Sequence, residues 1–337
     1  MVETKAIETD RRPRFAIIGG GATGGFLGAH LARAGYQVTL IARGAHLAAI
    51  RQSGLVVNCH DGASISACPD ATDEIAAIAD ADVVFLTVKA HSISAIAPSL
   101  GAALRPGATL ISAQNGVPWW YFHRHGGPLD GTQLASADPD GLVARHIDPD
   151  QVVGCIVYPS TAVIRPGVIE HIEGNRFSLG EPGRNSDSER CRVIASALVE
   201  AGLEAPIRTD IREELWLKLL GNAAFNPISA LTRGTLADIT TLPETRELAI
   251  LVMQEVDQVA RSLGIDIERG VERRIRGASR VGPHKTSMLQ DVEQKRPLEI
   301  DALLTAVLEL GGLLQLDLPH LRTLQACCKL LNLTQTG

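Results

Sequence analysis

Residues 15–41 have the sequence FAIIGGGATGGFLGAHLARAGYQVTLI. An apolar run at 15–18 stops at three glycines, an alanine- and leucine-rich stretch follows at 24–34, and a β-branched run at 37–41 ends the segment. Strand, glycine turn, helix and strand in this order make the smallest βαβ unit. Both strands are apolar without alternation, which indicates burial on both faces and therefore a parallel sheet.

The rest of the chain divides into two parts with different patterns. Up to about residue 209, short apolar runs alternate with helical segments, so we expect strands at 82–88, 109–113, 152–157 and 168–179 and helices at 75–79, 91–104 and 191–201. Beyond that point apolar residues recur every three or four positions, which predicts helices at 211–231, 248–263 and 298–316, the first with a kink at Asn226-Pro227, and no strand. The sequence therefore predicts a Rossmann-type α/β domain at 14–207 and an all-α domain at 208–332.

The composition is that of a globular protein. Hydrophobic residues make up 45% and charged residues 21% of the 337 residues, which suits a chain of about two domains. The net charge of −6 provides no electrostatic footprint for nucleic acid or an anionic membrane. No apolar run approaches the ~20 residues of a membrane span, and residues 1–14 lack the apolar segment of a signal peptide. We expect a cytoplasmic protein with six free thiols and no metal site.

The glycine turn has the spacing of a dinucleotide-binding loop. Gly19, Gly21 and Gly24 form G-x-G-x-x-G, in which the first allows a tight turn, the second a close approach to pyrophosphate and the third close packing of helix on strand. The helix start then offers free N–H groups to phosphate. The alternative is a glycine-rich turn that binds nothing. We expect the cofactor to lie against the whole loop, which comprises Gly19, Gly20, Gly21, Ala22, Thr23 and Gly24.

The end of the second strand indicates which dinucleotide binds. An NAD site usually has an acidic residue about 20 residues after the glycines, but no Asp or Glu occurs between Gly25 and His60. Arg43 stands just past the strand instead, and a guanidinium suits a 2′-phosphate. The alternative is a solvated surface arginine. The sequence predicts NADP(H) as cofactor.

Two more polar segments directly follow predicted strands. Lys89 comes after the strand that ends at Val88, and Asn115 follows the strand that ends at Ala113. Ligands of open α/β sheets bind at the carboxyl ends of strands, so we expect both residues to border the nicotinamide half of the site. A surface lysine and an ordinary Asn-Gly turn are the alternatives.

The helical part carries a polar stripe. Lys218, Asn222 and Asn226 are spaced i, i+4 and i+8, which places one cation and two amides on one face of a largely apolar helix. A lysine facing a bound carbonyl can act as general acid when hydride reaches the carbon. Interhelical hydrogen bonding is the alternative. Glu299 near the start of the helix at 298–316 is, taken alone, a capping or helix-dipole residue.

These residues, in this order, resemble the ketopantoate reductase family (2-dehydropantoate 2-reductases) from about Phe15 to Leu316. The Lys/Asn/Asn-Pro and Ser-Met-Leu-Gln-Asp blocks are specific to it, whereas the glycine motif is not. The matching blocks are Gly19-x-Gly21-x-x-Gly24, Arg43, Lys89-Ala90, Gln114-Asn115-Gly116, Lys218-x-x-x-Asn222-x-x-x-Asn226-Pro227, Ser287-Met288-Leu289-Gln290-Asp291 and Glu299-Ile300-Asp301.

The resemblance implies NADPH-dependent reduction of 2-dehydropantoate to (R)-pantoate, on the route to pantothenate and coenzyme A. It also implies a helical second domain like that of 6-phosphogluconate dehydrogenase and an active site in the cleft between the domains. Carried over by position, Lys218 is the proton donor, and Glu299 helps to fix substrate and cofactor. Asn115 contacts both ligands and Lys89 borders the cofactor. The residues that hold the substrate's hydroxyl and carboxylate are then Asn222, Asn226 and Ser287.

The chain departs from the family pattern at three places. Leu236-Ala237 stands where the family often has an Asn-Gly pair, and Leu298 replaces the usual threonine before the glutamate. The stretch at 118–122, Pro-Trp-Trp-Tyr-Phe, is unusually bulky. It is either a wall of the substrate pocket, a hydrophobic plug or an interdomain contact.

Alternatives to ketopantoate reduction are another branched 2-oxo acid as substrate, the chemistry of an opine or 3-hydroxyacid dehydrogenase, and an NADPH-binding module without turnover. The pairing of Lys218 with Glu299 favours ketopantoate-type chemistry, and a mere binding module leaves the polar stripe and Ser287 without a role. The expected partner is a small-molecule 2-oxo acid, with neither nucleic acid nor membrane. The sequence does not decide between a monomer and a homodimer.

Overall fold

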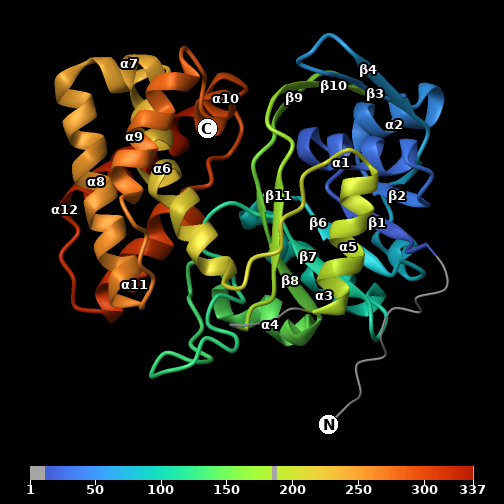
Figure 1. Ribbon diagram of the computed structural model, residues 1–337, viewed down its shortest axis with the longest axis horizontal. Helices are drawn as coiled ribbons and strands as arrows, with labels where there is room; N and C mark the ends of the chain where they lie inside the picture. The colour runs from blue at the N-terminus through green and yellow to red at the C-terminus, as the bar shows by residue number, and fades with distance from the viewer. Residues whose placement is uncertain (1–11, 184–187, 337) are drawn as a thin grey trace. The chain divides into compact units, whose positions relative to one another are not determined.

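The computed structural model describes residues 12–183 and 188–336, drawn in colour in Figure 1. The chain forms two compact units. The first takes in the chain up to Gln114, Trp119–Gln133 and Asp140–Ile211, and the second takes in Asn115–Pro118, Leu134–Pro139 and the chain from Arg212 onward. Two short segments of the N-terminal half thus belong to the second unit. Residues 1–11, which make up most of the stretch predicted to lack a signal peptide, lie outside the described residues.

A largely parallel sheet forms the centre of the first unit, as the apolar strands predict. Its strands follow the order β11-β8-β7-β6-β1-β2-β5, and β11 alone runs antiparallel to its neighbour. β1 lies between β2 and β6, which is the point where the strand order reverses in a Rossmann fold. The Rossmann-type prediction is confirmed. The strands are β1 (Phe15–Ile18), β2 (Val38–Ile41), β5 (Asp70–Thr72), β6 (Val83–Leu86), β7 (Thr109–Ser112), β8 (Val152–Val157) and β11 (Phe177–Gly180).

A second, four-stranded sheet was not predicted. It has the order β4-β3-β10-β9 and packs against α1 (Figure 1). The single strand expected at 168–179 is wrong, because the chain turns at Gly174, whose φ is +71°, so that its two halves join different sheets. The strands are β3 (Leu55–Asn58), β4 (Ser64–Ala67), β9 (Ser160–Arg165) and β10 (Val168–Glu173).

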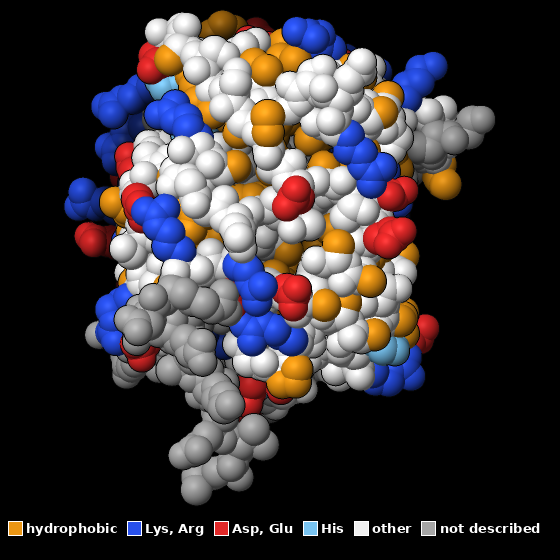
Figure 2. Space-filling view, turned by 90° about the vertical axis from the view of Figure 1, so that its right-hand side faces the viewer, with side chains coloured by type: hydrophobic (Ala, Val, Ile, Leu, Met, Phe, Trp, Pro, Cys, Tyr) orange, Lys and Arg blue, Asp and Glu red, His pale blue; other side chains and the backbone are white. Residues whose placement is uncertain are grey.

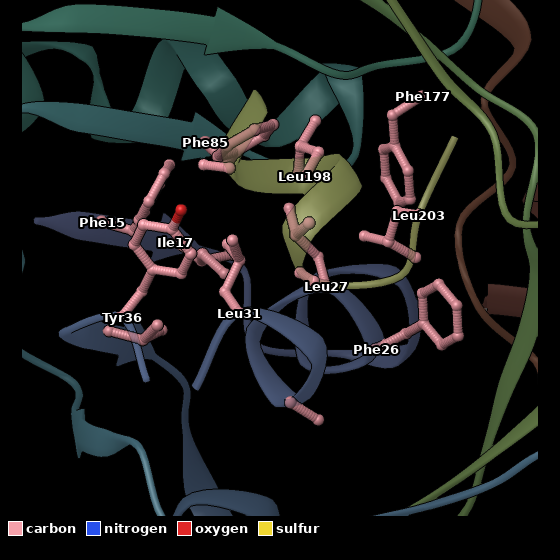
Figure 3. Packing of buried hydrophobic residues seen from close by; sticks show 14 of the residues in the cluster. Phe15, Ile17, Phe26, Leu27, Leu31, Tyr36, Phe85, Phe177, Leu198 and Leu203 are labelled. Atoms are coloured by element: carbon pink, nitrogen blue, oxygen red, sulfur yellow. The ribbon is translucent and has the colours of Figure 1, made fainter. Parts of the chain in front are cut away.

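Helix α1 (Ala22–Arg33) is packed so closely that glycine is required on it. A β-carbon at Gly25 would lie 2.4 Å from Ile169 of the small sheet, and one at Gly28 would lie 2.9 Å from Leu40 of β2. Figure 3 shows Phe26 and Leu27 of α1 within the buried cluster that also contains Phe15 and Phe177. This packing holds the start of α1, and with it the glycine turn, in place.

The remaining helices of the first unit connect or cover the strands. The helices predicted at 91–104 and 191–201 are confirmed as α3 and α5, whereas α2 was not predicted. Short 3₁₀ turns account for other connections, including the predicted helical segment at 75–79. The elements are α2 (Gly44–Ser53), η1 (Ile75–Ile78), η2 (Ala90–Ser92), α3 (Ile93–Ala103), η3 (Pro139–Gly141), α4 (Leu142–His146), η4 (Pro149–Gln151) and α5 (Glu189–Glu200).

The chain after Ile211 contains helices and, over its described residues, no strand, as predicted. Its first helix continues through Pro227, and the helix expected at 298–316 contains a π-turn at its beginning. No helix in the described ranges is long and apolar enough to cross a membrane. The helices are α6 (Ile211–Thr232), α7 (Leu236–Thr241), α8 (Pro243–Ser262), α9 (Gly270–Val281), α10 (Ser287–Glu293), η5 (Asp301–Thr305), α11 (Ala306–Leu313) and α12 (Pro319–Thr336).

Candidate active site

The glycine turn between β1 and α1 has the geometry that its spacing predicts. Gly19 has a φ of +105°, and a β-carbon there would lie 2.8 Å from the Val88 nitrogen. A β-carbon at Gly24 would lie 2.2 Å from the Gly19 carbonyl oxygen, so neither position admits a side chain. Gly21, by contrast, is exposed, and a β-carbon there would meet nothing within 4 Å. The turn is therefore tight inside and open at the N-cap of α1.

The open N-cap suits a phosphate group. Gly21 is the N-cap of α1, no side chain caps the helix, and its first turn holds no acidic residue. Ala22 and Thr23 follow, each partly exposed, and Gly20 is buried behind them. Backbone N–H groups and the positive end of the helix dipole are thus left to an anion. The residues present fit a dinucleotide pyrophosphate.

Two residues support this turn that sequence reasoning missed. The Thr87 hydroxyl at the end of β6 lies 3.1 Å from the Ile18 carbonyl oxygen and 2.9 Å from that of Gly19. On α2, His46 accepts the Gly167 N–H at Nδ1 over 3.0 Å. Burial lowers the pKa of His46, and a hydrogen bond to the Gly20 backbone acts in the opposite direction. A lone threonine and a lone histidine give no sequence signal, because only the folded chain brings them to the turn.

Arg43, the predicted ligand of a 2′-phosphate, follows β2, is exposed, and is the N-cap of α2. Gly44 behind it has a φ of +58° and open space around its α-carbon. The α2 first turn carries no acidic residue, so a cationic side chain and a helix N-terminus coincide here.

The ends of β6 and β7 are tied together by Gln114. Its side-chain amide donates to the carbonyl oxygens of Leu86 and Val88, and it accepts the Ser112 hydroxyl over 2.8 Å. Lys89 follows β6, half-buried, at the cap of η2. The structure thus places Lys89 at the carboxyl edge of the sheet that also carries the glycine turn.

The second unit brings Lys218 and Asn115 together. Lys218, half-buried on α6, donates from Nζ to Asn115 Oδ1 over 2.7 Å. Asn115 belongs to the short segment Asn115–Pro118, which lies in the helical unit although it follows strand β7. An ammonium held by an amide oxygen is oriented, and its remaining N–H groups can point to only a few positions.

The turn that carries Asn115 needs glycine at its next position. Gly116 has a φ of +87°, and a β-carbon there would lie 2.2 Å from the Ala302 carbonyl oxygen. The same oxygen accepts the Val117 N–H over 3.0 Å. Glycine therefore lets this turn rest directly on the backbone of η5, which sets the place of Asn115.

The other two residues of the polar stripe differ in how far they are buried. Asn222 is half-buried one turn after Lys218, and Asn226 is buried. Asn226 Nδ2 lies 3.5 Å from the Ser287 hydroxyl at the exposed start of α10. The structure thus brings together two pairs of predicted residues, Lys218 with Asn115 and Asn226 with Ser287. Glu299 is half-buried, two residues before the start of the π-turn η5.

The aromatic side chains of the bulky loop at 118–122 are buried. The side chains of Trp119, Trp120, Tyr121 and Phe122 are at most 8% exposed. A β-carbon at Gly154 of β8 would lie 2.7 Å from the Trp120 ring, so this indole packs directly against β8. Over the described ranges, no group of three or more His, Cys, Asp or Glu residues could hold a metal ion.

Comparisons with known proteins agree on one family. Residues 15–119 match the family model described as "Ketopantoate reductase PanE/ApbA", and residues 210–332 match "Ketopantoate reductase PanE/ApbA C terminal". A 2-dehydropantoate 2-reductase of Mesorhizobium japonicum is 48% identical over 307 residues, covering 91% of this chain and 94% of that protein.

Solved structures show the same fold. A chain from Ralstonia solanacearum MolK2 superimposes with a TM-score of 0.90 at 38% identity, covering 96% of this chain and 99% of that one. The PanE/ApbA family ketopantoate reductase of Ralstonia eutropha JMP134 superimposes with a TM-score of 0.82 at 26% identity, covering 96% and 100%.

Proposed function

The chain belongs to the ketopantoate reductase family of NADP-dependent oxidoreductases, and from this premise we propose that it reduces 2-dehydropantoate to (R)-pantoate with NADPH. The reaction would take place in the cytoplasm, on the route to pantothenate and coenzyme A. The observation that carries the proposal is the hydrogen bond from Lys218 to Asn115, because it supplies an oriented proton donor.

The first unit would hold the cofactor. The open N-cap at Gly21 and the neighbouring residues 19–24 fit the pyrophosphate, and exposed Arg43 fits the 2′-phosphate. Lys89 would border the nicotinamide half from the end of β6. NADPH, when bound, supplies the hydride. Because the chain has a net charge of −6, binding of an anionic cofactor would depend on these two cationic side chains.

The second unit would supply the proton. Hydride addition to the keto carbon leaves negative charge on the oxygen, and Lys218 donates a proton to that oxygen as general acid. Asn115 accepts one N–H of the ammonium and so directs the others. Glu299, a carboxylate at the start of the π-turn, would orient substrate and cofactor by accepting hydrogen bonds.

The amides would recognise the acid and the hydroxyl of the substrate. Asn222 and Asn226 follow Lys218 along the same face of α6, and Ser287 joins Asn226 from α10. Amide N–H and hydroxyl groups can donate to a carboxylate and also accept from a substrate hydroxyl. The set matches a small 2-oxo acid that carries a second polar group.

A branched 2-oxo acid other than ketopantoate is a second candidate. Leu236-Ala237, which replaces the pair often found in the family, forms the start of α7, and the Thr235 and Asp238 side chains cap that helix. The backbone N–H groups of Leu236 and Ala237 donate to the carbonyl oxygens of His284 and Gly282. An apolar helix start in place of an amide would favour a substrate with a larger apolar branch.

Steady-state NADPH oxidation across a panel of 2-oxo acids tests the proposal. We expect ketopantoate to give the highest kcat/KM, and NADPH to be preferred over NADH because of Arg43. Highest kcat/KM for a different branched 2-oxo acid would select the second candidate. No oxidation with any 2-oxo acid, with NADPH bound, would reject the reductase.

A further inference from the structure

The helix after Glu299 begins with a π-turn at Asp301–Thr305. Here the Ala306 N–H bonds the Asp301 carbonyl, five residues back. In a regular α-helix the same N–H would bond the Ala302 carbonyl, four residues back. Because of the extra residue in the turn, the Ala306 N–H does not serve as the α-helical donor to the Ala302 carbonyl. π-turns inside helices are often found at functional sites.

A short chain of contacts leads from that carbonyl to the proposed proton donor. The Ala302 carbonyl oxygen accepts the Val117 N–H over 3.0 Å, and Gly116 rests against it. Asn115 precedes this turn and accepts the Lys218 ammonium over 2.7 Å. The position of Asn115, and the direction of the Lys218 N–H groups, therefore depend on the π-turn.

Side chains hold the π-turn from two directions. The Thr305 hydroxyl donates to Asp301 Oδ1 across the turn over 2.9 Å, and it accepts Gln325 Nε2 of α12 over 2.8 Å. Asn332, also on α12, accepts the Leu298 N–H over 2.9 Å. Helix α12 thus fixes the chain on both sides of Glu299.

We propose that Thr305 and Gln325 are positioning residues of the reducing site, which hold the π-turn whose Ala302 carbonyl keeps Asn115 on Lys218. They act through Asn115 and not on the substrate. The inference rests on the proposed function, because it affects turnover only where Lys218 is the proton donor. Its effect on the Asn115 turn itself, however, can be measured without any substrate.

Three variants separate positioning from mere stability. Thr305→Val removes the hydroxyl with little change of volume, and Thr305→Ser keeps it. Gln325→Met removes the donor on α12. The matched control is Thr323→Val, because the exposed Thr323 hydroxyl on the same helix donates over 2.8 Å to the Pro319 carbonyl and has no link to η5.

We expect kcat to fall about 10-fold or more in Thr305→Val and in Gln325→Met, since a misplaced catalytic group can cost up to about 100-fold. Thr305→Ser and Thr323→Val should keep a kcat close to wild type, and KM for NADPH should stay unchanged in all variants. Unchanged kcat in Thr305→Val, or equal losses in Thr305→Val and Thr305→Ser, would overturn the proposal.

Hydrogen–deuterium exchange at the Val117 amide is the second readout. We expect faster exchange in Thr305→Val than in the wild type and in Thr305→Ser, because the bond to the Ala302 carbonyl loosens. Wild-type protection retained in Thr305→Val would refute the inference whatever the kinetics show. A wild type that reduces no 2-oxo acid would refute the proposed function alone. Exchange at the Val117 amide would then still test whether Thr305 holds the π-turn against the Asn115 segment.

Discussion

Lys218 and Asn115 are 103 positions apart in the sequence and hydrogen-bonded in the structure. The i, i+4, i+8 spacing predicted that Lys218, Asn222 and Asn226 share a face, because helix geometry is local. No local rule could bring Asn115 to that face. The residue next to it, Gly116, lies against the Ala302 backbone, and such a tertiary contact leaves no trace in the sequence spacing.

Arg43 is expected to determine cofactor choice. Arg43→Ala should weaken NADPH binding about 10- to 100-fold, the effect of losing one or two charge-assisted hydrogen bonds, and leave NADH binding unchanged. Titration of both cofactors by fluorescence measures this. Arg51→Ala is the matched control, because Arg51 is an exposed arginine at the other end of α2 that bonds the Ala71 carbonyl. Equal losses for NADPH and NADH, or an equal loss in the control, would contradict the assignment.

At the scale of elements, the βαβ unit was predictable and the small sheet was not. Strand β1 is apolar throughout and β2 nearly so, and they flank a glycine motif, so their pattern is strong. Strands β3, β4 and β9 are only partly buried, and β10 pairs in parallel with β3 more than a hundred residues away along the chain. Such pairing depends on tertiary packing against α1, which composition alone does not reveal.

The turn at Gly116 provides an element-scale prediction. Gly116→Ala should lower the free energy of unfolding by about 1–3 kcal/mol through its left-handed backbone, and should also reduce kcat because the β-carbon would push the turn off Ala302. Denaturant unfolding and steady-state kinetics measure the two effects. Gly126→Ala shares a positive φ, +77°, but has open space, so it should affect stability and not kcat. Wild-type kcat in Gly116→Ala would refute the role of this contact.

His30 on helix α1 is expected to make the stability of the fold depend on pH. Burial lowers the pKa of His30 from 6.5, and the charges of Arg33 and His171 lower it further, against a hydrogen bond to the Ala201 carbonyl. The unfolded chain therefore takes up a proton that the folded chain resists. Stability from this group is complete above pH 6.5 and is lost as the pH falls towards the lower folded pKa.

We therefore expect Tm to fall between about pH 7.5 and about pH 5.5, and to fall less in His30→Asn, whose amide can still donate to Ala201. Thermal unfolding across this range measures the slope. His91→Asn, at an exposed position, is the control. An equal slope in His30→Asn and the wild type would show that another group sets the pH dependence.

At the scale of the whole molecule, the two units are not continuous in the sequence. Asn115–Pro118 and Leu134–Pro139 come from the N-terminal half, yet they lie in the helical unit. The Glu309 carboxylate on α11 accepts the N–H groups of Ala135 and Ser136 over 2.8 and 2.9 Å, two turns after the Ala302 contact. One helix therefore anchors both segments, and only tertiary contacts could show it.

The face of the molecule shown in Figure 2 carries charges of both signs. Figure 2 shows Lys and Arg interspersed with Asp and Glu on the face turned to the viewer. The composition predicted as much, since the net charge is −6. Composition could not provide the position of Lys218, the cation proposed as proton donor.

The central claim is that Lys218 delivers the proton, and kcat of Lys218→Ala for ketopantoate reduction tests it most directly. NADPH binding should be retained while kcat falls about 10²- to 10⁴-fold, the usual value of general acid catalysis. Lys329→Ala, at an exposed position of α12, is the control and should keep wild-type kcat. A wild-type kcat in Lys218→Ala would contradict the account.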